Sequence, residues 1–146
     1  MNSNDQLADY LVEKGFIESE RVEKAFRNVD RAEFIDQDPY TDRPQQIGEN
    51  STISAPHIVA MMVEELDPEG KVLEMGSGYM LAILDELVDE VVGVERNKEL
   101  VDKSRNRLPD VRIIHGFQVP EEDFNAIIYS FATSEEKVRN SQSKTG

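Results

Sequence analysis

Four residues in the middle of the chain have types and a spacing that suit a nucleotide-like ligand. Gly76, Ser77 and Gly78 follow one apolar run, and Glu95 ends the next. Glycines after the first strand of a doubly wound sheet let the backbone approach a ligand, and the following helix offers free N–H groups. An acid at the end of the second strand can accept hydrogen bonds from a ribose diol. Together these residues favour a cofactor that contains a ribose.

The type of cofactor is narrowed by the neighbouring residues. A dinucleotide fingerprint needs a third glycine where this chain has Leu81, so NAD is not supported. S-adenosylmethionine fits better, because Glu74 precedes the glycines and can lie near a cationic sulfonium or amino group. Simpler interpretations stay open: the glycines only form a tight bend, Glu74 caps the next turn, and Glu95 caps the helix that begins near Asn97.

The segment that must position these residues alternates apolar runs with helical patterns. This alternation predicts a parallel sheet with right-handed crossovers. We expect strands at 71–75, 90–95, 110–116 and 125–132, and helices at 80–87 and 97–107. In the usual doubly wound order the strand at 125–132 lies at an edge of the sheet, where its Ile, Tyr and Phe side chains favour pairing with another chain.

The first 66 residues have the pattern of a helical subdomain. One helix ends at Gly15, a second is capped by Ser19, and a third begins near Pro56. Residues 35–53 contain two prolines and mostly polar side chains, which predicts a long irregular loop. The expected buried stripe of the third helix consists of Ile58, Val59, Met62, Val63 and Leu66.

Composition bounds the class of protein. A chain of 146 residues with 38% hydrophobic residues can fill the core of one domain. A formal net charge of −14 repels polyanions, so nucleic acid is a poor partner. The absence of cysteine excludes disulfides and thiolate metal sites and fits a cytoplasmic protein. The N-terminus has no apolar export signal, and the apolar run at 58–63 is too short to span a bilayer, so we expect no membrane association.

Three stretches of the chain resemble the protein-L-isoaspartate O-methyltransferase family. Residues 22–35 are similar to its helix that ends in Val-Pro-Arg-x-x-Phe, with Asp30 in place of proline. Residues 40–62 resemble its Tyr, Asp and Pro loop followed by Thr-Ile-Ser-x-Pro-His, which is the most specific motif and occupies 52–57 here. Residues 71–100 resemble its glycine turn and ribose-binding strand.

The resemblance implies an α/β fold, namely a truncated Rossmann-like S-adenosylmethionine-dependent methyltransferase with a parallel sheet of about four strands and an N-terminal helical subdomain. It implies one compact unit with helices and the substrate loop at 1–66, the cofactor-binding core at 67–133 and a polar tail at 134–146. The cofactor would be S-adenosylmethionine, bound by Glu74, Gly76, Ser77, Gly78 and Glu95, and no metal would be needed.

The implied activity is methyl transfer to the isoaspartyl carboxylate of damaged proteins or peptides. Ser54, the expected catalytic residue, would hold that carboxylate with the backbone of Ile53 at the N-terminus of the helix beginning at Pro56, where free N–H groups attract anions. Ser54 could instead be a plain N-cap. Tyr40 and Asp42 would line the substrate cleft.

Several departures from the family pattern keep a second function open. The glycine turn is two residues shorter than the family's, and Phe117 stands where the family has an acid that contacts adenine. Phe117 could stack on adenine or be an ordinary core aromatic. The family continues beyond the fourth strand, so the resemblance is to a C-terminally short member. The alternative is therefore a catalytically inactive relative that binds cofactor or protein partners, and either form could dimerise through the strand at 125–132.

Overall fold

The computed structural model describes residues 1–47, 51–76 and 78–129. The chain divides into two compact units, Met1–Asp67 and Pro68–Gly146. Ser77 and the polar tail expected at 134–146 lie outside the described residues.

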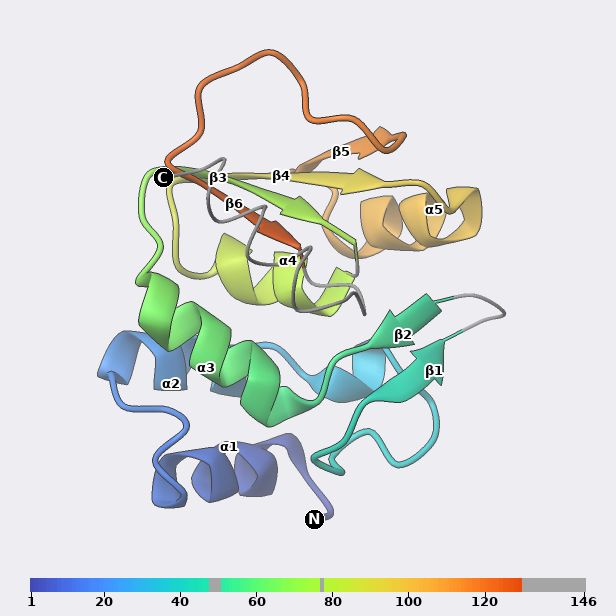
Figure 1. Cartoon of the computed structure of the whole chain (residues 1–146). Coiled ribbons are helices and arrows are strands. Elements are labelled where there is room, and N and C mark those ends of the chain that lie inside the picture. The colour runs from blue at the N-terminus through green and yellow to red at the C-terminus, as the bar shows by residue number, and fades with distance from the viewer. Residues whose placement is uncertain (48–50, 77, 130–146) are drawn as a thin grey trace. The chain divides into compact units, whose positions relative to one another are not determined.

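The N-terminal unit is mainly helical in its described part. It contains α1 (Asn4–Glu13), α2 (Glu20–Asn28), the 3₁₀ helix η1 (Arg31–Glu33) and α3 (Pro56–Leu66), as Figure 1 shows. Two predicted helix ends are confirmed: Gly15 has φ +82°, and the Ser19 side chain accepts a hydrogen bond from the backbone N–H of Val22. Helices α1 and α2 pack together and bury a shared apolar seam. The seam is formed by Leu7, Leu11, Val22, Ala25 and Phe26.

The loop expected at 35–53 is not irregular throughout. Strands β1 (Gln45–Ile47) and β2 (Ser51–Ile53) pair in an antiparallel ladder in which Gln45 lies opposite Ile53. Three-residue strands are too short to produce a readable alternation in the sequence. Ile53 ends the ladder with an exposed fraction of only 1%, so this segment is anchored in the unit just before α3 begins.

Helix α3 begins at Pro56, as predicted, but its buried face differs from the predicted stripe. Val59 and Val63 are buried as expected, and Ala60 is buried with them. Ile58 and Leu66 are each 40% exposed, so their assignment to the core is wrong. The helix carries apolar residues around most of its circumference, and in such a sequence periodicity cannot select the face that faces the core.

The C-terminal unit contains the predicted parallel sheet. Its strands β3 (Lys71–Met75), β4 (Glu90–Glu95), β5 (Arg112–His115) and β6 (Ala126–Tyr129) are ordered β5-β4-β3-β6. Helices α4 (Gly78–Asp85) and α5 (Lys98–Arg107) connect the strands and lie on the same side of the sheet in Figure 1. Right-handed crossovers that advance in one direction place successive helices on one face. The expected Rossmann-like α/β fold is confirmed.

The element boundaries differ little from the prediction. Helix α4 begins two residues earlier than expected, at Gly78, and β5 is shorter than the predicted strand at 110–116. In the described part of the sheet, β6 pairs with β3 and lies at the edge, as predicted; residues 130–132 of the expected strand lie outside the described residues. The described residues contain no helix that is long and apolar enough to cross a bilayer.

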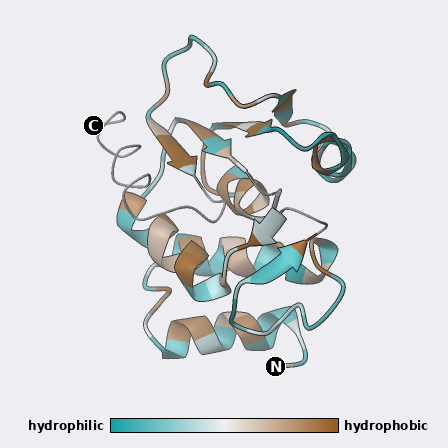
Figure 2. Ribbon diagram, turned by 45° about the vertical axis from the view of Figure 1, so that its right-hand side comes forward, coloured by the Kyte–Doolittle hydropathy of each residue, from teal (hydrophilic) through white to brown (hydrophobic). Residues whose placement is uncertain are grey.

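The two helices of this unit differ in polarity. Residues 79–84 of α4 are all buried, whereas α5 buries Val101 and Ser104 and is mainly hydrophilic in Figure 2. A separate core cluster is formed by Leu73, Met75, Val92 and Val94 of the two central strands. Strands that are buried on both faces are typical of parallel sheets. The packing of β3 and β4 fixes the position of their carboxyl ends, where the candidate site lies.

Candidate functional site

The candidate cofactor site lies at the carboxyl edge of the four-stranded sheet. The backbone N–H of Gly76 donates to the carbonyl of Val94 at 3.1 Å, and the N–H of Gly116 donates to the carbonyl of Glu95 at 2.9 Å. These hydrogen bonds hold the chain beyond β3 and β5 against the end of β4. The structure therefore brings the glycine turn, Glu95 and the segment after β5 to one edge, where ligands bind in open α/β sheets.

Gly76 makes the bend at the end of β3. Its φ is +127°, a backbone conformation that residues with a Cβ rarely adopt. Gly78 opens α4 two residues later. Ser77, the remaining predicted residue of this turn, lies outside the described residues. The bend therefore requires a glycine at position 76 and leads directly to a helix N-terminus.

Glu95 is the last residue of β4 and is 9% exposed. Its Oε2 accepts a hydrogen bond from the backbone N–H of Asn97 at 2.9 Å. Burial raises the pKa of the Glu95 carboxyl, and the backbone N–H groups of Asn97 and Arg96 oppose that rise. The N-cap of α5 is Asn97, whose Oδ1 accepts from the N–H groups of Glu99 and Leu100, so the interpretation of Glu95 as the cap is wrong.

Glu74 is fully buried in the central strand. It lies between Gly93 of β4 and Ile128 of β6 in the strand register, two residues before Gly76. Burial of a carboxylate is costly unless other groups compensate it. The acidic surface of the protein therefore does not explain Glu74, because this residue is buried.

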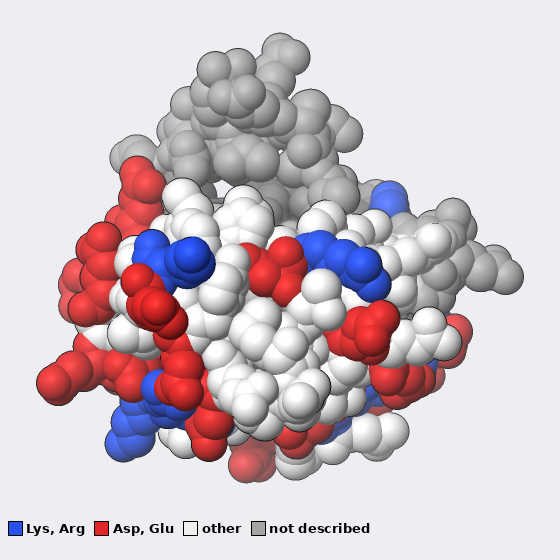
Figure 3. All heavy atoms as spheres, turned by 90° about the horizontal axis from the view of Figure 1, so that it is seen from below, with Lys and Arg blue, Asp and Glu red and all other residues white. Residues whose placement is uncertain are grey.

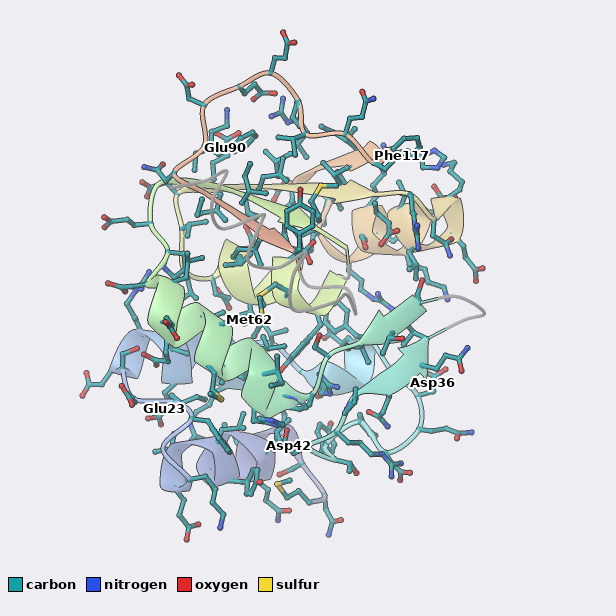
Figure 4. All side chains as sticks on the ribbon, in the orientation of Figure 1. Glu23, Asp36, Asp42, Met62, Glu90 and Phe117 are labelled. Carbon is teal, nitrogen blue, oxygen red and sulfur yellow. The ribbon has the colours of Figure 1, made fainter. Side chains whose placement is uncertain are left out.

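Phe117 is 75% exposed and lies beyond the end of β5 (Figure 4). Its interpretation as a core aromatic is wrong, because the chain has already left the sheet at this point. His115 is exposed, and its Nε2 lies 3.0 Å from the carbonyl oxygen of Arg96. The segment after β5 thus presents an exposed aromatic ring at the carboxyl edge of the sheet.

The predicted carboxylate site in the N-terminal unit lies where β2 leads into α3. The N-cap of α3 is Ala55, without a side-chain cap, so the interpretation of Ser54 as a plain N-cap is wrong. Asp42 lies beside this helix end in Figure 4, and its Oδ1 accepts from the backbone N–H of His57 at 2.9 Å. Ile58 N–H donates to the Ala55 carbonyl, and Pro56 has no N–H. The first-turn N–H groups are therefore occupied within the protein.

The polar atoms of Tyr40 and Asp42 bond to groups in the same unit. The Tyr40 hydroxyl donates to Asp30 at 2.8 Å, and this hydrogen bond raises the pKa of Tyr40. Asp42 Oδ1 also lies 2.8 Å from Nδ1 of His57. The side chain of Asp42 is only 10% exposed, whereas that of His57 is 31% exposed. Asp42 thus acts as an internal anion at the N-terminus of α3.

Arg31 is a residue that the sequence analysis did not select. It is 0% exposed, and its Nη2 donates to the backbone carbonyl of Ser54 at 3.0 Å. The available signal was its place in the element that resembles Val-Pro-Arg-x-x-Phe. Only the fold brings η1 to the segment between β2 and α3. Without that proximity, nothing indicates that Arg31 contacts Ser54.

The described residues contain no group of three or more His, Asp or Glu that could hold a metal ion. The polar groups assembled here are instead suited to two tasks. The edge of the sheet offers a carboxylate beside a glycine bend, which suits a ribose and an attached cation. The Ile53–Ser54 segment offers backbone and hydroxyl groups, which suit a carboxylate.

Comparisons with known proteins agree with this arrangement. The family described as protein-L-isoaspartate(D-aspartate) O-methyltransferase (PCMT) matches residues 2–123. A protein-L-isoaspartate O-methyltransferase of Methanopyrus kandleri is 45% identical over 117 residues, which are 73% of this chain and 52% of that protein. One of Methanothermobacter thermautotrophicus is 38% identical over 132 residues, which are 80% of this chain and 61% of that protein.

A solved structure is similar as well. It is a Plasmodium falciparum protein assigned as a protein-L-isoaspartate O-methyltransferase, in complex with S-adenosyl-L-homocysteine. It has a TM-score of 0.75 and 28% identity, with 88% of this chain and 73% of that chain covered. The chain spans between about half and two thirds of the length of the two curated relatives. The family match and these identities show that the chain belongs to the protein-L-isoaspartate O-methyltransferase family.

Proposed function

We propose that this protein transfers the methyl group of S-adenosylmethionine to the free carboxylate of isoaspartyl residues in damaged proteins. One observation carries the proposal. The buried carboxylate of Glu95 stands at the end of β4, beside the positive-φ bend at Gly76, as a ribose-binding edge requires. Family membership supports the same activity.

The residues at the sheet edge fit S-adenosylmethionine. Glu95 would accept hydrogen bonds from the ribose diol, because one of its oxygens is held by Asn97 and this hydrogen bond fixes the orientation of the carboxylate. Gly76, Ser77 and Gly78 would let the backbone approach the methionine part, and Glu74 would stabilise the cationic end of the molecule. Phe117, exposed at the same edge, would stack on the adenine.

The substrate carboxylate would be held by the backbone of Ile53 and the hydroxyl of Ser54. This assignment does not use the first turn of α3, since Asp42 already accepts from His57 N–H there. Tyr40 and Asp42 would shape the wall of the cleft through their hydrogen bonds rather than contact the substrate directly. Ser54 is the residue that touches the reacting group.

The chemistry asks little of the protein in acid or base catalysis. The cofactor supplies a methyl group on a sulfonium, which a carboxylate can attack without an added base. What the reaction mainly requires is that the two reactants are held in line and that water is excluded. Neutralisation of opposite charges as the bond forms is favoured in a site with little water.

The proposed partners follow from the same chemistry. Isoaspartyl proteins and peptides would be the substrates, and the cytoplasm, where there is no selection for disulfides, would be the compartment. Acidic side chains make up most of the charged surface in the face drawn in Figure 3, and the net charge of −14 disfavours nucleic acid. A second copy could pair along β6, whose outer edge has no partner strand among the described residues.

Two measurements test the function. Calorimetric titration with S-adenosylmethionine should show one site, and methyl transfer should occur to an isoaspartyl peptide but not to the same peptide with a normal aspartyl bond. Binding without transfer would identify a cofactor-binding relative that lacks activity. Absence of binding would overturn the assignment of the sheet edge.

A further inference from the structure

We infer that Arg31 is a positioning residue for the substrate carboxylate: its buried guanidinium donates a hydrogen bond to the Ser54 carbonyl and so fixes that peptide group. This inference rests on the proposed function and deepens it. Nη2 of Arg31 donates to the Ser54 carbonyl at 3.0 Å, and the side chain is fully shielded from water. Arg31 therefore contacts the residue that would hold the substrate without reaching the solvent-facing side itself.

The position of Arg31 is itself strongly determined. Its backbone N–H donates to Oδ1 of Asn4 at 3.3 Å, and Nδ2 of Asn4 donates to the carbonyl of Phe26 at 2.9 Å. Asp30, the N-cap of η1, accepts from Ala32 N–H at 2.9 Å. Helices α1 and α2 thus fix the backbone at the start of η1, from which the Arg31 side chain extends.

The Ile53–His57 segment is held at two points by groups of opposite charge. Arg31 holds the carbonyl of Ser54, and Asp42 holds both the N–H and Nδ1 of His57. Ile53, immediately before Ser54, is 1% exposed and pairs with Gln45 in the hairpin. With the residues on either side of it fixed, the backbone of Ser54 has little freedom.

Two physical effects would act on a bound carboxylate. A hydrogen bond to the Ser54 carbonyl fixes the plane of the peptide that it shares with the N–H of Ala55. A guanidinium stays protonated at all physiological pH values, and in a site with little water it favours a nearby anion. A buried charge adds little net stability, because its desolvation offsets much of the gain from its contacts.

The first test uses NMR to monitor the Ser54–Ala55 peptide group, and it does not depend on enzymatic activity. In ¹H–¹⁵N spectra of the whole chain, Arg31→Met should shift the Ala55 amide strongly, because this N–H belongs to the peptide whose carbonyl Arg31 holds. Arg31→Lys keeps the charge and should cause a smaller shift. The matched control is Glu64→Ala, which removes a different anchor: Oε1 of Glu64 accepts from the backbone N–H groups of Glu18 and Ser19. An Ala55 amide that moves no more in Arg31→Met than in Glu64→Ala overturns the inference.

The second test separates positioning from general stability. The KM for an isoaspartyl peptide should rise about tenfold or more in Arg31→Met, because a misplaced Ser54 no longer holds the substrate carboxylate in the productive geometry, and small misplacements can cost up to about 100-fold. Arg31→Lys should recover part of this loss, and the affinity for S-adenosylmethionine should stay at the wild-type value in both variants. Glu64→Ala should lower the melting temperature and leave KM unchanged.

The outcomes distinguish this inference from the proposed function. An active wild-type chain whose KM is unchanged in Arg31→Met refutes only the role of Arg31. A wild-type chain that transfers no methyl group refutes the function and, with it, the role that depends on it. If Arg31→Met does not fold, Arg31→Lys decides the question, since the planar fork of Arg is lost in Lys. A wild-type KM in Arg31→Lys together with an unmoved Ala55 amide would then overturn the inference.

Discussion

Replacing Glu95 with Gln should weaken cofactor binding without weakening the fold. Glu95 is 9% exposed, and its Oε2 is engaged by Asn97 N–H. The amide oxygen of Gln can keep that hydrogen bond, which then leaves an NH₂ donor where the ribose diol needs an acceptor. The loss of one charge-assisted hydrogen bond is about 1.5–3 kcal/mol, so the Kd for S-adenosylmethionine should rise about 10- to 150-fold.

The affinity of Glu95→Gln for S-adenosylmethionine should fall, whereas the stability of its fold should stay the same or rise. Burial raises the folded-state pKa of Glu95, so its contribution to stability is present below the unfolded pKa and is lost as pH rises through the folded pKa. At pH 7 the carboxylate therefore disfavours the folded state, and Glu95→Gln should not lower the melting temperature of the free chain. Loss of affinity at equal or greater stability would separate a binding role from a structural one.

Calorimetry of Glu95→Gln and of a matched control checks this reasoning. Glu99→Gln makes the same chemical change four residues later, at an exposed position in the first turn of α5. The control should bind S-adenosylmethionine within about twofold of wild type. A Glu95→Gln variant whose Kd is also within about twofold would refute the ribose assignment.

Substitutions at three further positions test the packing and charges within the two units. Asp42→Ala should cost about 1 kcal/mol of unfolding free energy, the usual value of a lost helix cap, whereas Asp42→Asn keeps the acceptor and should cost less; urea denaturation measures both. Gly93→Val should cost about 1–3 kcal/mol, because a Cβ at Gly93 would lie 2.9 Å from Cδ2 of Leu81, and a wild-type denaturation midpoint would contradict this packing. Arg112, followed by Lys71, lowers the pKa of Glu122 to about 2 from 4.5, so the stability contributed by this carboxylate is present above the unfolded pKa and is lost as pH falls through the folded pKa. Acid titration of Glu122→Gln should therefore show a smaller loss of stability between those two pKa values than wild type, and identical curves would argue against these ion pairs.

Local patterns were sufficient for the sheet and for the bend at its edge. Strands β3 and β4 occupy the predicted residues, because short continuous apolar runs between turn residues are typical of buried strands in α/β proteins. Gly76 and Glu95 could be selected for a related reason, since a doubly wound sheet brings the ends of adjacent strands to one edge. These features depend on residues that are close in sequence and on a general rule of topology.

The role of Leu81 shows where that reasoning stopped. The absence of a third glycine at this position of α4 argued against NAD, because in the dinucleotide fingerprint that glycine allows close packing of helix and strand. The structure makes room for Leu81 with a glycine on the partner strand instead, Gly93. Which of two contacting elements carries the small residue cannot be read from the motif of one element alone.

The sequence by itself determined the α/β class, the order of the strands and helices of the C-terminal unit and the residues at the carboxyl edge, because period, glycine placement and strand ends are local properties. The tertiary structure decided which groups neighbour Ser54. Arg31 lies 23 residues away from it and Asp42 lies 15 residues before His57, and nothing in their local sequence indicates these partners. Contacts between segments so far apart exist only after the chain has folded, and one of them, from Asp42, occupies the His57 N–H that helix-end reasoning had left free for a substrate.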